Sequence, residues 1–175
     1  MYSRNSMKET GKIFILLTVT CLVSCQIQIG TNEDKPDEKK IVYNLDPALM
    51  LRLINEQRTA GCKCGDTDMP PVPKVKWNDL LAKAAYNHSV DMYTHRTLNH
   101  TSSDGRSPDD RIKATGYSPA TWGENIAVGY SNENSVIQGW MKSPGHCANI
   151  MNANLTEVGV GREGNYWTMV LARPR

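Results

Sequence analysis

The segment 140–151 constrains the fold most, because it places the end of one helix and the start of another within twelve residues. Ser143-Pro144 is typical of an N-cap followed by proline at the first helical position, where the missing N–H has no intrahelical partner. His146 then lies in the first turn, where the helix dipole disfavours protonation of the imidazole. A neutral nitrogen there can bind a metal or a polar ligand. A histidine at such a position can also serve only in capping or packing.

The amino-terminal segment has the pattern of an export signal. Three basic side chains precede an apolar run at 13–23, which is shorter than the roughly 20 residues that a membrane-spanning helix requires. We therefore predict that residues 1–24 are a signal peptide and that the chain is exported.

The apolar run leads directly into a cysteine. Residues 22–25, Leu-Val-Ser-Cys, resemble the lipobox of bacterial lipoproteins, in which the cysteine is lipidated and becomes the first residue of the mature chain. A lipid on Cys25 anchors a domain to a membrane face, in the cell envelope, on the periplasmic or the exterior side. Ordinary signal cleavage with an unmodified Cys25 is the alternative. We predict a flexible tether at 25–44, because it is charged and contains proline, and one domain at 45–175.

The charge of the chain argues against a nucleic-acid partner. Its formal net charge of +2 arises from 20 basic and 18 acidic side chains. Residues 1–24 hold three of the basic and one of the acidic groups, so 17 of each sign remain in the mature chain. No nucleic acid is expected to bind this balanced surface.

Three cysteines belong to the predicted domain, because Cys21 leaves with the signal peptide and Cys25 carries the lipid. They are Cys62, Cys64 and Cys147. An oxidising compartment favours a disulfide, and we predict the pair Cys64–Cys147, with one thiol left over. The Cys-x-Cys spacing is too short for a zinc ribbon.

Cap signals and periodicity predict helices first and the clearest strands last. We expect an irregular loop at 62–75, and two strands at 156–161 and 166–172 that form a hairpin around 162–165. This order indicates an α+β fold with an antiparallel sheet covered by helices. The predicted helix starts are Asp46, Asn78 or Asp79, Ser107, and Ser131 or Asn132.

Three side chains stand out for chemistry: His100 in a polar, turn-rich loop, Glu124 at the expected start of a strand, and His146. Two imidazoles and a carboxylate suit zinc and leave a coordination position open. Their spacing alone does not establish that they converge. His88 shares a helix face with apolar residues and is interpreted as a core histidine.

Seven short motifs follow one another in order along residues 46–172. They are Leu51-x-x-Ile54-Asn55-x-x-Arg58, Val75-x-Trp77-Asn78-x-x-Leu81, His100-x-x-x-Asp104-Gly105, Gly123-Glu124-Asn125-Ile126-Ala127, Trp140-Met141-x-Ser143-Pro144-Gly145-His146-x-x-Asn149-Ile150-Met151, Glu157-Val158-Gly159-Val160-Gly161 and Tyr166-Trp167-Thr168. Together they resemble the CAP superfamily, which includes cysteine-rich secretory proteins with their SCP domain, venom antigens and plant pathogenesis-related proteins. With the lipobox, the chain resembles a bacterial lipoprotein member.

The resemblance implies an α-β-α sandwich with a central antiparallel sheet and a cleft. In the family a His-Glu-Glu-His tetrad lines that cleft, and the match carries over to His100, Glu124 and His146. Ser143 stands where the eukaryotic pattern has the second glutamate, so transfer of a eukaryotic activity is not implied. Bacterial relatives with a cysteine after the histidine also have an early Cys-Gly, as here, which supports the predicted disulfide.

Three functions are open on these grounds. The first is a membrane-anchored extracytoplasmic domain whose cleft holds a divalent metal, zinc, and a small-molecule, peptide or glycan ligand. His100 and His146 would ligate the metal, Glu124 would be a third ligand or orient a water, and Ser143 would line the ligand site. The second is a metal-assisted hydrolase of peptide or cell-wall material, with Glu124 as catalytic base. The third is a lipid-binding module, which a single Phe supports poorly.

Overall fold

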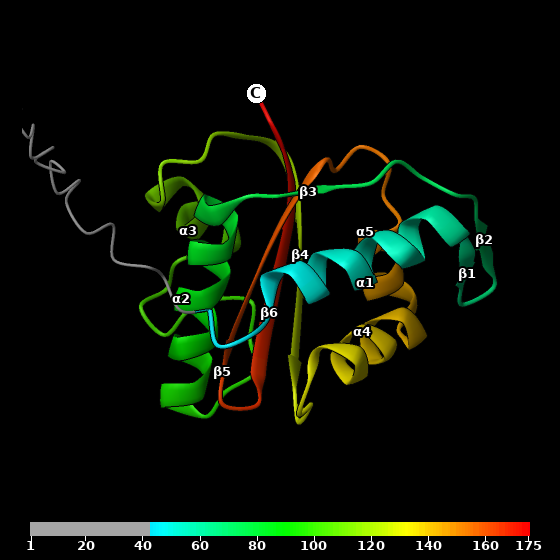
Figure 1. The fold of residues 1–175 in the computed structure, drawn as a ribbon. Helices are drawn as coiled ribbons and strands as arrows, with labels where there is room; N and C mark the ends of the chain where they lie inside the picture. Colours follow the sequence, from blue (N-terminus) through cyan, green and yellow to red (C-terminus); the bar gives the residue numbers. More distant parts are fainter. Residues whose placement is uncertain (1–42) are drawn as a thin grey trace, which may run out of the picture. The chain divides into compact units, whose positions relative to one another are not determined.

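The computed structural model describes residues 43–175 (Figure 1). The predicted signal peptide, the lipobox with Cys25 and most of the predicted tether lie outside these described residues. Of the helices in the described part, none is both long and apolar enough to cross a bilayer.

The described residues form five helices and six strands. The helices are α1 (Pro47–Ala60), α2 (Asp79–His95), α3 (Pro108–Ala114), α4 (Glu133–Lys142) and α5 (Pro144–Ile150). The strands are β1 (Cys62–Cys64), β2 (Thr67–Met69), β3 (Lys76–Trp77), β4 (Pro119–Val128), β5 (Glu157–Glu163) and β6 (Tyr166–Pro174).

The helices begin where local cap signals predict. Asp46, Asn78, Ser107 and Asn132 each accept a hydrogen bond from a backbone N–H of the first turn that follows, so these starts are confirmed. Ser143 stands at the N-cap position of α5, before proline at the first helical position, but its side chain makes no capping hydrogen bond. Its carbonyl accepts the first hydrogen bond of α5.

The main sheet has the strand order β3-β5-β6-β4. β6 pairs antiparallel with both β5 and β4, and the two-residue β3 adds a parallel pair at the β5 edge. The hairpin between β5 and β6 turns at Gly164-Asn165, and Gly164 has φ +58°, which a glycine adopts without steric cost. The predicted hairpin and the α+β class are confirmed.

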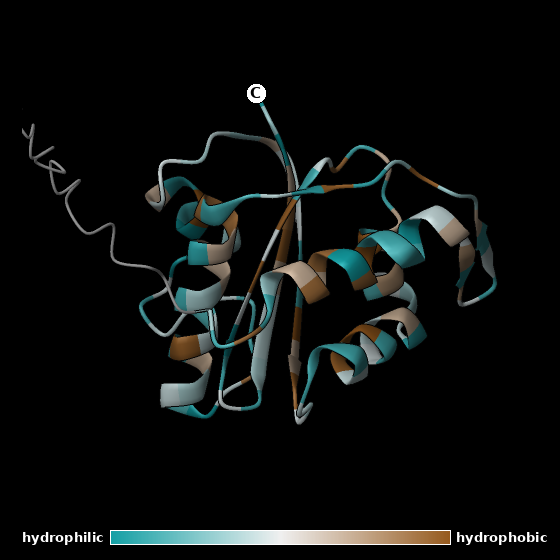
Figure 2. Ribbon diagram, viewed as in Figure 1, coloured by the Kyte–Doolittle hydropathy of each residue, from teal (hydrophilic) through white to brown (hydrophobic). Residues whose placement is uncertain are grey.

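Helices cover both faces of this sheet (Figure 1). α2 packs on β5 and β6, with α3 beside it, while α1, α4 and α5 pack on the other face. Side chains of β6 alternate between two cores: Met169 and Leu171 face α1, α4 and α5, whereas Val170 and Ala172 face α2 and α3. The result is an α-β-α sandwich whose helices each carry hydrophilic and hydrophobic residues (Figure 2).

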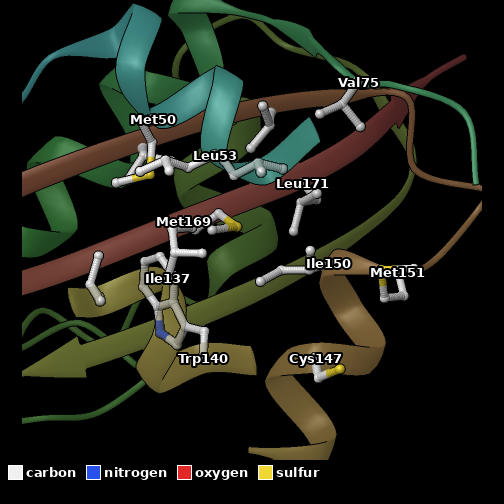
Figure 3. Close-up of a cluster of buried hydrophobic side chains, with 14 of the residues drawn as sticks. Met50, Leu53, Val75, Ile137, Trp140, Cys147, Ile150, Met151, Met169 and Leu171 are labelled. Atoms are coloured by element: carbon white, nitrogen blue, oxygen red, sulfur yellow. The ribbon is translucent and has the colours of Figure 1, made fainter. Parts of the chain in front are cut away.

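The larger core joins α1, α4 and α5 to the sheet (Figure 3). Met50 of α1, Trp140 of α4 and Ile150 of α5 meet Met169 of β6 there, and all four are at most 1% exposed. Burial of such large side chains contributes about 1.5–3 kcal/mol each. α5, which is only seven residues long, depends on this core.

Arg58, near the end of α1, is a buried polar clamp in the same region. Its guanidinium donates to the carbonyls of Pro73, Ile150, Asn152 and Leu155, at 2.6–3.1 Å. Four carbonyls accept from one side chain that is 1% exposed, so each nitrogen of the buried guanidinium has at least one acceptor. Arg58 thereby ties α1 to the segment that follows α5.

The prediction of an irregular loop over 62–75 was wrong for its first half. β1 and β2 form an antiparallel ribbon, in which Cys64 and Thr67 flank the two-residue turn Gly65-Asp66. A two-residue loop that starts with glycine at positive φ, here +63° at Gly65, is a favoured hairpin connection. The Gly-Asp pair was therefore a usable signal.

Two glycines of β5 let α2 approach the sheet closely. A Cβ on Gly159 would collide with the backbone of Leu81 and Ala82, and one on Gly161 would collide with the backbone of Tyr86. Backbone atoms in a packed helix cannot move aside as a flexible side chain does.

We therefore expect Gly159→Ala to lower the free energy of unfolding by about 3 kcal/mol, the upper end of the usual range for overpacking. The control is Gly145→Ala in α5, where an added Cβ meets nothing within 4 Å. It should change stability by less than about 1 kcal/mol. Urea denaturation followed by circular dichroism measures both, and equal effects would contradict the packing argument.

Candidate functional site

Glu124 lies in the middle of β4, opposite Val170 of β6. We expected it at the start of a strand, and that expectation was wrong. β4 begins at Pro119, because residues before Glu124 pair with the end of β6, although they lack a run of apolar side chains. The strand places the Glu124 side chain, 2% exposed, at the level of α3 and the loop before it.

Both carboxylate oxygens of Glu124 have charged or polar partners. Arg111 of α3 donates from Nη2 to Oε2 at 2.6 Å, and the two side chains are 4% and 2% exposed. Oε1 is 2.8 Å from Nδ1 of His100. A buried carboxylate needs such partners, because an unpaired buried charge is strongly destabilising.

Arg111 also organises the loop that carries His100. Its Nη1 donates to the backbone carbonyls of His100 and Arg106, at 2.9 and 3.0 Å, and to Ser102 Oγ at 3.1 Å. One guanidinium thus fixes the loop and the strand that bears Glu124 relative to one another.

The contact with Glu124 assigns the tautomer of His100. A carboxylate paired with arginine only accepts hydrogen bonds, so Nδ1 of His100 carries the proton and donates it. Nε2 is then free to accept or to bind a metal when the ring is neutral. The His100 side chain is 52% exposed, so a ligand can reach it.

Asparagine side chains hold α5 against β4 at the same level. Asn125 Nδ2 donates to the carbonyl of His146 at 3.0 Å, and Asn149 Nδ2 donates to the carbonyl of Glu124 at 3.3 Å and to Asn125 Oδ1 at 2.9 Å. These contacts place the partly buried His146 beside the Glu124 segment. Burial lowers the pKa of His146, and the positive charge of His100 lowers it further. Burial, rather than the helix dipole alone, thus favours the neutral ring.

The predicted site residues are brought together to different degrees. His100 and Glu124 are in contact, and His146 is near enough to His100 to feel its charge. Their ligand atoms are not all within 4.8 Å of one another: in the part of the chain that the structure describes, only three cysteines form such a group. Ser143, partly buried, stands at the junction of α4 and α5, and its backbone N–H donates to Trp140 O at 3.1 Å.

Two further residues support the loop. His88 is fully buried, which confirms the core interpretation; its Nε2 is 2.8 Å from the carbonyl of Asn99, and burial lowers its pKa. Ser102 Oγ lies 3.3 Å from His88 Nδ1. Sequence reasoning did not select Arg111, because an arginine in a short charged helix gives no sign that it is buried.

A disulfide joins Cys64 of β1 to Cys147 of α5, the pair chosen in the sequence analysis. Cys62 remains outside it. The first turn of α5 is thus held from two sides, by the asparagine contacts to β4 and by this bond to β1.

Comparison with known proteins gives one consistent result. The family model described as cysteine-rich secretory protein family, CAP, matches residues 51–170. The uncharacterised protein YkwD of Bacillus subtilis is 41% identical over 93 residues, which are 52% of this chain and 36% of the relative. This chain therefore spans about a third of that curated relative's length.

Solved structures agree in fold. An extracellular protein containing a SCP domain from Bacillus anthracis is 28% identical with a TM-score of 0.65, over 72% of this chain and 39% of that one. An outer surface protein of Borrelia burgdorferi has a TM-score of 0.62 at 21% identity, over 73% and 92%. The α-β-α arrangement is shared with both.

Removal of Arg111 should test the ion pair that supports this site. Arg111→Ala leaves Glu124 buried without its charged partner, and we expect the free energy of unfolding to fall by about 3–5 kcal/mol. The matched control is Arg106→Ala, which removes an exposed pair with Asp104 and should lose at most about 1 kcal/mol. Urea denaturation gives both values. Losses of equal size would mean that the buried pair contributes no more to the free energy of unfolding than the exposed pair does.

Proposed function

Because the chain belongs to the CAP family of cysteine-rich secretory proteins, we propose that it is an exported, membrane-tethered domain that binds a divalent metal, zinc, through His100 and His146. One observation carries the metal assignment: Nδ1 of His100 donates to a buried carboxylate, which leaves Nε2 for a metal. Metal-ligating histidines typically have this arrangement.

The donor set fits zinc. Imidazole nitrogens suit zinc, and a ligand histidine must be neutral. Burial lowers the pKa of His146, so its ring is neutral near neutral pH and available. When bound, the metal would offer a Lewis-acidic centre with positions open to oxygen atoms of a small-molecule, peptide or glycan ligand.

Glu124 fits a supporting role better than that of a ligand or a base. One of its oxygens accepts from His100 and the other from Arg111. We therefore assign to Glu124 the orientation of the His100 ring. The alternative of a hydrolase that uses Glu124 as general base has less support, because the carboxylate is 2% exposed and is paired with Arg111, which lowers its basicity. We assign no role in ligand binding to Ser143.

Export and tethering are proposed from the amino-terminal pattern. Residues 22–25 resemble a lipobox, and the similar Bacillus anthracis protein is described as extracellular. A lipid on Cys25, followed by a polar segment, would hold the domain near the membrane surface on the outer side.

Zinc binding tests the metal proposal directly. We expect the full-length chain, freed of metal, to bind zinc, and His100→Ala or His146→Ala to weaken the affinity at least tenfold. Glu124→Gln should weaken it about 10–100-fold, because it removes the carboxylate that orients His100 but no proposed metal ligand. Isothermal titration with zinc alone, in a Cys62→Ser background that removes the free thiol of the described domain, gives the affinities.

The matched control is His95→Ala, which removes an exposed histidine of α2. This variant should bind zinc as the parent does. Equal zinc affinity and stoichiometry in the parent and in His146→Ala would defeat the proposal.

The tether is tested by Cys25→Ser in a bacterial host. We expect the parent chain in the membrane fraction and the Cys25→Ser chain largely outside it, because the lipid is its only proposed anchor. Cys21→Ser, four residues earlier, is the control and should stay with the membrane. Immunoblots of the fractions measure the distribution, and an unchanged distribution for Cys25→Ser would refute the anchor.

A further inference from the structure

Three cysteine sulfurs gather where the β1–β2 ribbon packs against α5. Cys64 and Cys147 form the disulfide, and their Cα atoms are 5.4 Å apart. Sγ of Cys62 lies 3.6 Å from Sγ of Cys147 and 3.8 Å from Sγ of Cys64. The bonded cysteines are buried, at 5% and 0% exposure, whereas Cys62 is partly exposed.

The strand explains why all three sulfurs meet. Side chains of a strand alternate between faces, so Cys62 and Cys64 share the face toward α5, while Lys63 points to solvent and pairs with Asp68. The turn also lies against α5, because a Cβ on Gly65 would come within 3.1 Å of Pro144 Cγ. Cys147 projects from α5 (Figure 3), and α5 packs against β1 of this ribbon.

We propose that Cys62, Cys64 and Cys147 form a thiol–disulfide exchange site. The thiolate of Cys62 attacks Sγ of Cys147, the Cys62–Cys147 bond forms, and the Cys64–Cys147 bond breaks. Cys64 leaves as a thiolate and takes up a proton from solvent, which replaces the one that Cys62 released. One disulfide replaces another, so the step needs no oxidant or reductant.

The geometry selects Cys147 as the sulfur that is attacked. It is the nearer of the two, at 3.6 Å against 3.8 Å, and because Cys62 Sγ lies beside the disulfide, its side chain must rotate into line with that bond before it attacks. Attack on Cys64 would join residues i and i+2 of one strand. Their Cα atoms are about 6.6 Å apart in an extended strand, at the limit of what a disulfide spans.

A metal site is a weaker interpretation of the same cluster. Metals bind thiolates, and two of these three sulfurs are already bonded to each other. The exchange does not depend on the histidine site, so it is assayed with a chelator present. Burial raises the pKa of the Cys62 thiol, so mildly alkaline buffer is used to supply the thiolate.

Trypsin can report which disulfide is present, because it cuts between the two cysteines of β1 after Lys63. Cys62 then lies in peptide 59–63, Cys64 in 64–74 and Cys147 in 143–162. The full-length chain is incubated, its free thiols are blocked with N-ethylmaleimide, and the linked peptides are identified by mass spectrometry. We expect 143–162 linked to 64–74 and also to 59–63.

Two variants define the controls. Cys62→Ser should lose the 59–63 linkage completely. Cys64→Ser, oxidised with glutathione disulfide, should form Cys62–Cys147 and provides the reference for the linked peptide. The digest of the wild-type chain decides whether the exchange occurs, and its result does not depend on whether a variant folds. If it contains only the 64–74 linkage, the proposal is overturned, and a 59–63 to 64–74 linkage would overturn the choice of Cys147.

Discussion

The buried ion pair between Arg111 and Glu124 is the interaction on which the rest of the site depends. Its side chains come from the consecutive elements α3 and β4, are 13 residues apart, and meet only when the strand packs beside the helix. Each partner also makes further polar contacts. Glu124 accepts from His100, and Arg111 donates to backbone carbonyls of the loop that carries His100. The charges are therefore compensated in the interior, and this compensation fixes an exposed imidazole in one orientation.

α5 is the second element that must be held from outside. Seven residues are too few to form a stable helix alone. The core residue Ile150, the disulfide at Cys147, the Asn149 side chain and the Arg58 clamp all bind it to different neighbours. Local sequence signals set where α5 begins, but these long-range contacts keep it helical and set the position of His146.

The distinction between local signals and long-range contacts also separates what the sequence predicts from what it does not. Helix starts such as Ser107-Pro108 were predictable, because the cap and the proline act within one turn. The place of Glu124 within β4 was not, because strand pairing with β6 extends the strand over residues without an apolar pattern. The role of Arg111 was hidden for a related reason: burial of a charge depends on its partner, and that partner lies 13 residues away on the next element, beyond the span of a local pattern. Residue type and position indicated the candidates His100 and His146, and the family resemblance supported them, but neither showed how each is held.

His146 and Cys147 are neighbours in sequence, yet they serve different sides of α5. Successive residues of a helix point about 100° apart, so one side chain can face the β4 segment while the next faces the β1–β2 ribbon. In both disulfide isomers of the exchange site Cys147 stays bonded to β1, and only its partner changes. A disulfide between α5 and β1 is therefore present both before and after the exchange. The asparagine contacts that position His146 are made to a different strand. Because the two attachments use different strands, thiol chemistry on one side of α5 is compatible with an undisturbed histidine site on the other.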